Sequence, residues 1–186
     1  MIVLCRHAAT EHNLAMRFIS TTDLPLGTHG RLQSDRLREA LRSFTFERCL
    51  VSPMQRCLET RAIVAPDVPY EIEPALREVD FGAWEGQTLE WVERHTPDLL
   101  AARRRDPVSF QPPDGESIEE AAARLAGVAL RLRNAGGTLV VGHRLTLGIL
   151  ERLLRDLPLR SRLVVGLEPA TFRVVDASAP RSATER

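Results

Sequence analysis

Short apolar runs alternate with longer segments of mixed apolar and polar residues along most of the chain. Runs of this kind predict buried strands, and segments with apolar positions three or four residues apart predict helices. The expected strands span 2–5, 49–51, 68–72, 138–141, 163–165 and 171–175. The expected helices span 28–44, 54–64, 89–105, 145–155 and a stretch that starts at Ser117 and stops before Gly136. This order predicts an α/β protein, a three-layer α/β/α sandwich with a mainly parallel central sheet.

Local signals refine several of these elements. Ser117 and Glu120 match a capping box at the start of one helix, and Thr28 is expected to cap another, with Leu32 among its apolar positions. Pro97 is expected to interrupt or divide the helix over 89–105. Pro69 favours a sheet edge for the strand at 68–72, because proline cannot donate to a ladder of hydrogen bonds.

Polar segments follow three of the expected strands directly. They are Arg6-His7, the stretch 52–56 and Gly142-His143. Ligands of parallel sheets bind beyond the carboxyl ends of the strands, so these three segments are expected to meet at one rim. The stretches 8–27 and 76–87 lack periodicity and are expected to be loops; long loops in compact domains are often functional.

The residue types at this rim suit phosphoryl transfer. A neutral imidazole such as that of His7 attacks phosphorus without a base to remove a proton, and Arg6 and Arg56 offer forked donors to phosphoryl oxygens. His143 is a further donor, and Glu78 is a candidate acid for the departing oxygen. Taken singly, each residue also fits a structural role. Arg56, for instance, is placed to pair with Glu59 on a helix.

Composition narrows the setting. The chain has 186 residues with 25 basic and 25 acidic side chains, so its formal net charge is +0. We expect one domain over 1–176, a disordered polar tail over 177–186, and no general attraction to nucleic acid or membrane. The basic residues are all arginine, which excludes lysine chemistry. Three cysteines, no signal peptide and no apolar run of about 20 residues predict a cytoplasmic protein.

Six blocks of the chain, in order, resemble the histidine phosphatase superfamily, which includes cofactor-dependent phosphoglycerate mutases, fructose-2,6-bisphosphatases and α-ribazole phosphatases. The blocks are Arg6–Asn13, Asp23–Leu26 with Gly30, Ser52–Thr60, Leu76–Gly86, Pro112–Ser117 and Val140–His143. They extend over nearly all of the chain up to about Val175. The short chain and the Asp80–Gly86 pattern look most like the small α-ribazole phosphatase-type enzymes. The resemblance implies a phosphoglycerate mutase-like fold.

The resemblance also implies roles for individual residues. His7 would be the phosphorylated nucleophile and Glu78 the proton donor, and the phosphoryl group would be held by Arg6, Arg56, His143 and Asn13. The pocket entrance would include Thr10 and the loop from Arg17 to Ser20. Three positions depart from the family pattern, namely Ala8 for glycine, Ala9 for glutamate and Arg144 for glycine. Arg144 is expected either to reach the substrate or to point into solvent.

These residues predict a phosphomonoesterase that needs no metal or cofactor and acts on a small phosphorylated substrate. A mutase-type phosphotransferase and a non-catalytic phosphate-ligand binder are the alternatives. The lysine typical of the mutases has no counterpart, since Leu89 occupies that position, and the run 103–105 reads as a solvated helix face. Cys49 and Arg56 are one residue too far apart for a cysteine-dependent phosphatase. The histidines show no metalloprotease spacing. The physiological substrate and the oligomeric state are not predicted.

Overall fold

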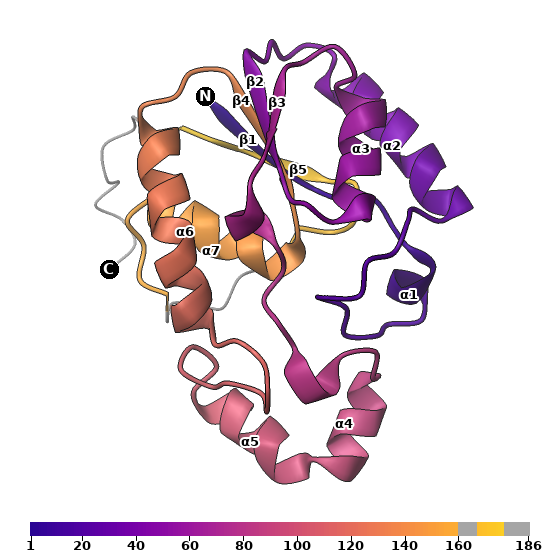
Figure 1. Cartoon of the computed structure of the whole chain (residues 1–186), viewed down its shortest axis with the longest axis vertical. Helices are drawn as coiled ribbons and strands as arrows, with labels where there is room; N and C mark the ends of the chain where they lie inside the picture. Colours follow the sequence, from indigo (N-terminus) through magenta and orange to yellow (C-terminus); the bar gives the residue numbers. More distant parts are fainter. Residues whose placement is uncertain (160–166, 177–186) are drawn as a thin grey trace.

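The computed structural model describes residues 1–159 and 167–176 (Figure 1). Its sheet has five strands in the spatial order β3-β2-β4-β1-β5. The strands are β1 (Ile2–Arg6), β2 (Arg48–Val51), β3 (Tyr70–Ile72), β4 (Thr138–Gly142) and β5 (Phe172–Val175). The first four run parallel to their neighbours, whereas β5 pairs antiparallel with β1. The α/β prediction with a mainly parallel sheet is confirmed.

Most predicted strands appear within one or two residues of their expected bounds. The strand expected at 68–72 is shortened to β3, and it lies at an edge of the sheet, as Pro69 predicted. The strand expected at 163–165 and the tail at 177–186 lie outside the described residues.

The helices also follow the sequence pattern, with three corrections. They are α1 (Glu11–Leu14), α2 (Thr28–Leu41), α3 (Gln55–Val64), α4 (Leu89–His95), α5 (Pro97–Arg105), α6 (Ile118–Arg133) and α7 (Arg144–Leu154). The stretch expected to be loop at 8–27 contains α1. Gly27, not Thr28, occupies the cap position of α2, and Leu32 is 56% exposed because it faces away from the sheet. Pro97 divides the expected long helix, and the capping box of Ser117 forms.

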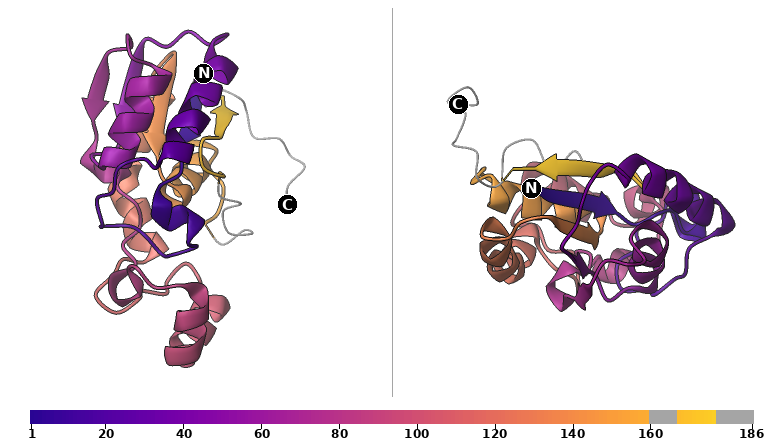
Figure 2. Two further views of the ribbon diagram at one scale, coloured as in Figure 1. Left: turned by 90° about the vertical axis from the view of Figure 1, so that its right-hand side faces the viewer. Right: turned by 90° about the horizontal axis from the view of Figure 1, so that it is seen from above.

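Helices cover both faces of the sheet, so the fold has three layers (Figures 1 and 2). Side chains alternate between the two faces along each strand. Ile2 and Leu4 of β1 pack with α6 and α7, whereas Val3 and Cys5 of the same strand pack with α2 and α3. The two resulting clusters bury nearly every side chain of β1, β2 and β4, which makes the sheet a rigid base for its strand ends.

A smaller unit projects beyond the end of the sheet and contains α4 and α5 (Figure 1). We call residues 82–115 the lobe. It has its own apolar cluster around Trp84, Val92 and Leu100. The two chain crossings into the lobe touch each other, because the Ala83 amide donates to the Pro113 carbonyl at 2.8 Å. A Cβ on Gly82 would lie 2.1 Å from that carbonyl oxygen, so only glycine fits there.

Across the described ranges, no helix has the length and apolar character needed to cross a bilayer.

Candidate active site

The carboxyl ends of β1, β4 and β2 bring three sequence-distant segments together. Hydrogen bonding of the sheet continues past the strands, from the His7 amide to the Gly142 carbonyl and from the Ser52 amide to the Val141 carbonyl, both at 3.0 Å. The rings of His7 and His143 consequently lie edge to face with centroids 5.1 Å apart. The predicted convergence at one rim is therefore observed.

His7 is held as a neutral imidazole with one defined tautomer. Its Nδ1 lies 2.7 Å from the carbonyl oxygen of Ala8. Because a carbonyl only accepts, Nδ1 carries the proton and Nε2 keeps its lone pair. Burial, followed by the charges of Arg56 and Arg6, holds the pKa of His7 well below 6.5. The ring is therefore uncharged at neutral pH, with the lone pair of Nε2 available.

Arg56 lies beneath the two histidines with all its nitrogens engaged. Nη1 donates to the Thr22 carbonyl and Nη2 to the Ser20 carbonyl, both at 2.9 Å. Nε donates to His143 Nδ1 at 3.4 Å. These contacts fix the plane of a guanidinium that is 1% exposed. The helix pairing with Glu59 is not formed; Glu59 instead accepts from Arg31 and Gln55.

His143 is also neutral, and both its ring nitrogens have partners. Since Arg56 donates to Nδ1, the proton of the ring sits on Nε2 and is donated to Ser52 Oγ at 2.8 Å. Burial is the largest cause that holds the pKa of His143 well below 6.5. For His143 to donate to a phosphoryl group, it must give up the contact with Ser52.

Arg6 has a hydrogen-bond donor without a partner among the described residues, its buried Nε. Its Nη1 donates to the Leu167 carbonyl at 2.8 Å. Burial lowers the pKa of Arg6, and Glu78 and Glu168 oppose that effect. A partly desolvated cation with an unused donor is suited to an anionic ligand.

Glu78 reaches the same place from the loop that precedes the lobe. Its Oε1 accepts from the backbone amides of Val79 and Thr146, and from Thr146 Oγ1, each at 3.0 Å. Its Oε2 accepts from the Leu145 amide at 3.2 Å. The carboxylate thus sits at the N-terminal end of α7, where helix amides attract negative charge.

Four of these five side chains, those of Arg6, His7, Arg56 and Glu78, line a cleft of about 510 Å³. His143 is 1% exposed and is not in the lining. We call Arg6, His7, Arg56 and His143 the floor: the first three line the cleft, and His143 packs against the ring of His7. Arginines outnumber acidic residues five to two in the lining of the cleft. The cleft is therefore electropositive in a chain whose net charge is zero, which favours a phosphate dianion there. The acidic members are Glu78 and Glu168, and the arginines are Arg6, Arg17, Arg56, Arg103 and Arg144.

Four of the five residues expected to bind substrate outside the catalytic group line the cleft. They are Thr10, Asn13, Arg17 and Arg144. Asn13 Oδ1 accepts from the Thr10 amide at 3.0 Å, which leaves the side-chain NH2 as the donor available to a ligand. Ser20 is not in the lining. It is 2% exposed, and its hydroxyl donates to Glu85 at 2.6 Å.

The two alanines beside His7 are accommodated without strain. Ala8 has a negative φ, as it is absent from the positive-φ residues of the described chain, so its methyl group is tolerated. Its amide donates to Thr60 Oγ1 at 3.0 Å. Ala9 is 3% exposed, and its carbonyl lies where a Cβ on Gly30 would clash at 2.0 Å. A glutamate at position 9 would need a different packing of α2.

Two residues that help to form the site, Glu85 and Arg103, were not predicted from the sequence. Glu85 accepts from the amides and hydroxyls of Ser20 and Thr22, and so orders the two carbonyls that hold Arg56. Arg103 was expected on a solvated helix face, but it is partly buried over the rings of Phe18 and Trp84, 5.6 and 5.5 Å from their centroids. The Asp80–Gly86 motif contained the signal for Glu85; no local signal separated Arg103 from its two neighbours.

Among residues 1–159 and 167–176, no three His, Cys, Asp or Glu side chains are grouped so as to hold a metal ion.

A family model described as the histidine phosphatase superfamily (branch 1) matches residues 2–185. The chain belongs to this superfamily. Among curated relatives, 6-phosphofructo-2-kinase/fructose-2,6-bisphosphatase of Gallus gallus is 34% identical over 145 residues, which is 77% of this chain and 30% of that protein. The mouse protein 6-phosphofructo-2-kinase/fructose-2,6-bisphosphatase 1 matches with the same figures. The chain thus spans less than a third of the length of these two relatives.

Solved structures of the superfamily share the fold. The α-ribazole phosphatase from Shigella flexneri superposes with a TM-score of 0.82 at 24% identity, covering 92% of this chain and 87% of that one. The YhfR protein of Bacillus stearothermophilus gives a TM-score of 0.77 at 27% identity, covering 93% and 94%. The predicted phosphoglycerate mutase-like sandwich is thereby confirmed.

Proposed function

We propose that this protein is a phosphomonoesterase that hydrolyses a small phosphorylated metabolite through a phosphohistidine on His7, without a metal ion. The observation that carries the proposal is the hydrogen bond from His7 Nδ1 to the Ala8 carbonyl. It leaves the Nε2 lone pair for attack on phosphorus. Membership of the superfamily and its phosphatase and bisphosphatase relatives support the same reaction class.

The charges around His7 support binding of the phosphoryl group. Arg6 and Arg56 both line the cleft with His7, and the guanidinium of Arg56 is held in place by two backbone carbonyls. Such preorganised cations stabilise the negative charge of the transferring group without having to reorganise during the reaction. Asn13 adds a side-chain amide from the entrance.

Two chemical steps follow from this arrangement. In the first, Nε2 of His7 forms a bond to phosphorus, the bond from phosphorus to the ester oxygen breaks, and the leaving oxygen takes the proton of the Glu78 carboxyl group. In the second, the Glu78 carboxylate takes a proton from water, whose oxygen bonds to phosphorus as the bond to Nε2 breaks. Inorganic phosphate and the neutral His7 are regenerated.

A phosphohistidine trap tests the proposal. Rapid acid quenching is too harsh for this adduct, so we would quench the enzyme in alkali during turnover of 4-nitrophenyl phosphate and locate phosphate by mass spectrometry. We expect it on His7. His7→Ala should lower hydrolysis by about 10⁴-fold or more, whereas the exposed His29→Ala on α2 should retain it. A fully active His7→Ala enzyme would falsify the proposal.

One panel of phosphate esters distinguishes the phosphatase from the mutase and the non-catalytic binder. Incubation with 3-phosphoglycerate distinguishes release of inorganic phosphate from formation of 2-phosphoglycerate, which is the mutase outcome. Binding of phosphate esters with neither product would identify a non-catalytic binder. α-Ribazole phosphate and fructose bisphosphates complete the panel.

A further inference from the structure

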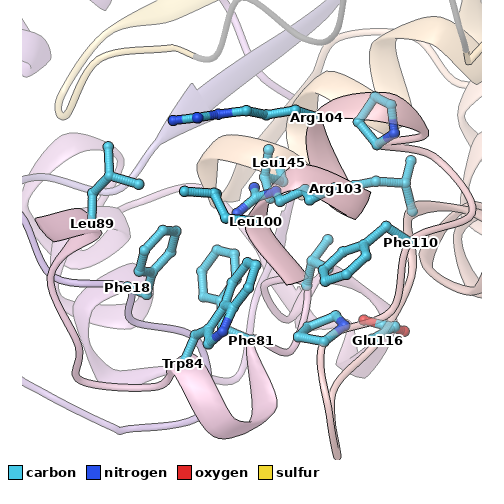
Figure 3. A pocket seen from close by; sticks show the side chains of 14 residues that line it. Phe18, Phe81, Trp84, Leu89, Leu100, Arg103, Arg104, Phe110, Glu116 and Leu145 are labelled. Atoms are coloured by element: carbon cyan, nitrogen blue, oxygen red, sulfur yellow. The ribbon is translucent and has the colours of Figure 1, made fainter. Parts of the chain in front are cut away.

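A second cavity lies next to the cleft, between the lobe and the sheet layers (Figure 3). Its volume is about 460 Å³, within the range of cavities that enclose small organic ligands. Four aromatic side chains line it, with aliphatic residues between them. We call this cavity the aromatic chamber; its aromatic residues are Phe18, Phe81, Trp84 and Phe110.

The aromatic chamber adjoins the cleft. Five residues line both cavities, namely Phe18, Phe81, Leu89, Arg103 and Leu145. A substrate whose phosphoryl group lies on the floor therefore has the chamber as a direct extension for the rest of its structure.

The lining of the chamber is unsuited to a polyhydroxylated leaving group. Glu116 is the acidic residue in the lining, and it is already paired with Arg124 at 2.7 Å and with Arg77 at 3.4 Å. Sugar hydroxyls that entered would lose their hydrogen bonds to water and find few acceptors in exchange. A flat apolar group would instead bury its faces against aromatic rings.

The aromatic rings of the chamber pack against one another. Phe110 and Trp84 are stacked with centroids 5.4 Å apart. Phe18 meets Phe81 edge to face at 5.1 Å. Arg103 lies over both Trp84 and Phe18 at the junction with the cleft, and burial lowers its pKa. Its guanidinium is thus placed between the phosphoryl site and the rings.

We infer that the substrate is a phosphate monoester whose alcohol carries a flat aromatic ring, and that this ring occupies the aromatic chamber. The inference rests on the proposed function. Arg103 then contacts the ester end of the leaving group, and Phe110 contacts only the ring, because it lines the chamber and not the cleft.

A matched pair of alkyl phosphates tests this without changing the chemistry of the leaving oxygen. We would compare 3-phenylpropyl phosphate with 3-hydroxypropyl phosphate, whose departing alcohols are similar in basicity. We expect kcat/KM of the wild-type enzyme to be on the order of 100-fold higher for the phenyl ester, as for large apolar groups in fitted pockets. Phe110→Ala should reduce that advantage about tenfold, because the loss on the phenyl ester exceeds any change on the hydroxypropyl ester.

Phe110→Leu, which keeps an apolar side chain, should lose less than Phe110→Ala. The hydroxypropyl ester reports in the same samples whether each variant is folded. Equal kcat/KM for the two esters, or equal losses on both in Phe110→Ala, would overturn the inference while hydrolysis itself upheld the proposed function. Absence of hydrolysis and of a phosphohistidine with any ester would instead overturn the proposed function.

Discussion

The floor of the cleft and the lobe above it are built in opposite ways. Two side chains of the floor are held by backbone carbonyls far away in the sequence: Arg6 donates to Leu167, and Arg56 donates to Ser20 and Thr22. A third, His143, is held by the distant side chains of Ser52 and Arg56. The lobe packs on its own small cluster, and its two ends meet at Gly82 and Pro113. In the proposed function, the floor provides a fixed geometry for phosphoryl transfer, and the lobe provides the surface that distinguishes substrates.

After the loss of His7 itself, the largest expected effect concerns Glu78, which links the two regions. Glu78→Gln keeps an oxygen for the amides of Val79 and Thr146 but removes the transferable proton. We expect kcat with an alkyl phosphate to fall by about 10²–10⁴-fold, with phosphate binding retained. Steady-state kinetics and inhibition by phosphate measure the two quantities. The exposed Glu90→Gln on α4 is the matched control, and an unchanged rate in Glu78→Gln would remove Glu78 from the acid role.

A smaller effect concerns the pH dependence of stability. Burial keeps the folded pKa values of His7 and His143 well below 6.5, so below that pH the unfolded chain binds protons that the folded chain does not. The free energy of unfolding therefore falls as pH falls, by up to about 1.4 kcal/mol per pH unit for each histidine. Urea unfolding between pH 7.5 and 5.5 measures this slope.

A variant of the floor identifies the source of that slope. His7→Gln removes one of the two buried imidazoles and should make the slope shallower, whereas His29→Gln on the exposed side of α2 should not. Equal slopes in the wild-type protein and His7→Gln would show that the floor does not hold this histidine neutral.

The smallest effect concerns the lobe. Arg103→Met keeps the length of the side chain but removes the cation between the cleft and the aromatic chamber. We expect about a tenfold loss of kcat/KM, mostly in KM, because one partly desolvated charge is lost from binding. Arg105→Met, on the exposed end of the same helix, is the control. If both variants lose equally, the lobe acts through general charge and not through a placed residue.

The same contrast explains what was predictable from the sequence. The position of the floor could be predicted from the sequence, because His7, Ser52 and His143 each follow a short apolar run. Parallel strands bring such positions to one rim of the sheet. The residues that contact the floor from distant parts of the sequence could not be predicted in the same way. Ser20 was expected at the entrance but turns inward to Glu85, since a hydroxyl in a loop carries no local signal of its direction.

The lobe was less predictable still. Arg103, Arg104 and Arg105 are chemically identical in the sequence, and only the packing of α5 separates them. Arg104 pairs with Glu93 at 2.8 Å, whereas Arg103 turns over Trp84 and Phe18. Two expected features, the strand at 163–165 and the tail at 177–186, lie beyond what the structure describes.

Because the two chain crossings meet at Gly82 and Pro113, the segment between them can be exchanged without altering the sheet. The closure of this segment is set by backbone atoms at the neck, where the Glu116 amide also donates to the Asp80 carbonyl at 2.9 Å. Doubling the length of the enclosed segment would add only about 0.6 kcal/mol to the entropy cost of closing it. A graft between Gly86 and Pro112 keeps Glu85, and with it the support of Arg56. If the lobe holds the leaving group as proposed, insertion and exchange within it change the substrate preference and leave His7 in place.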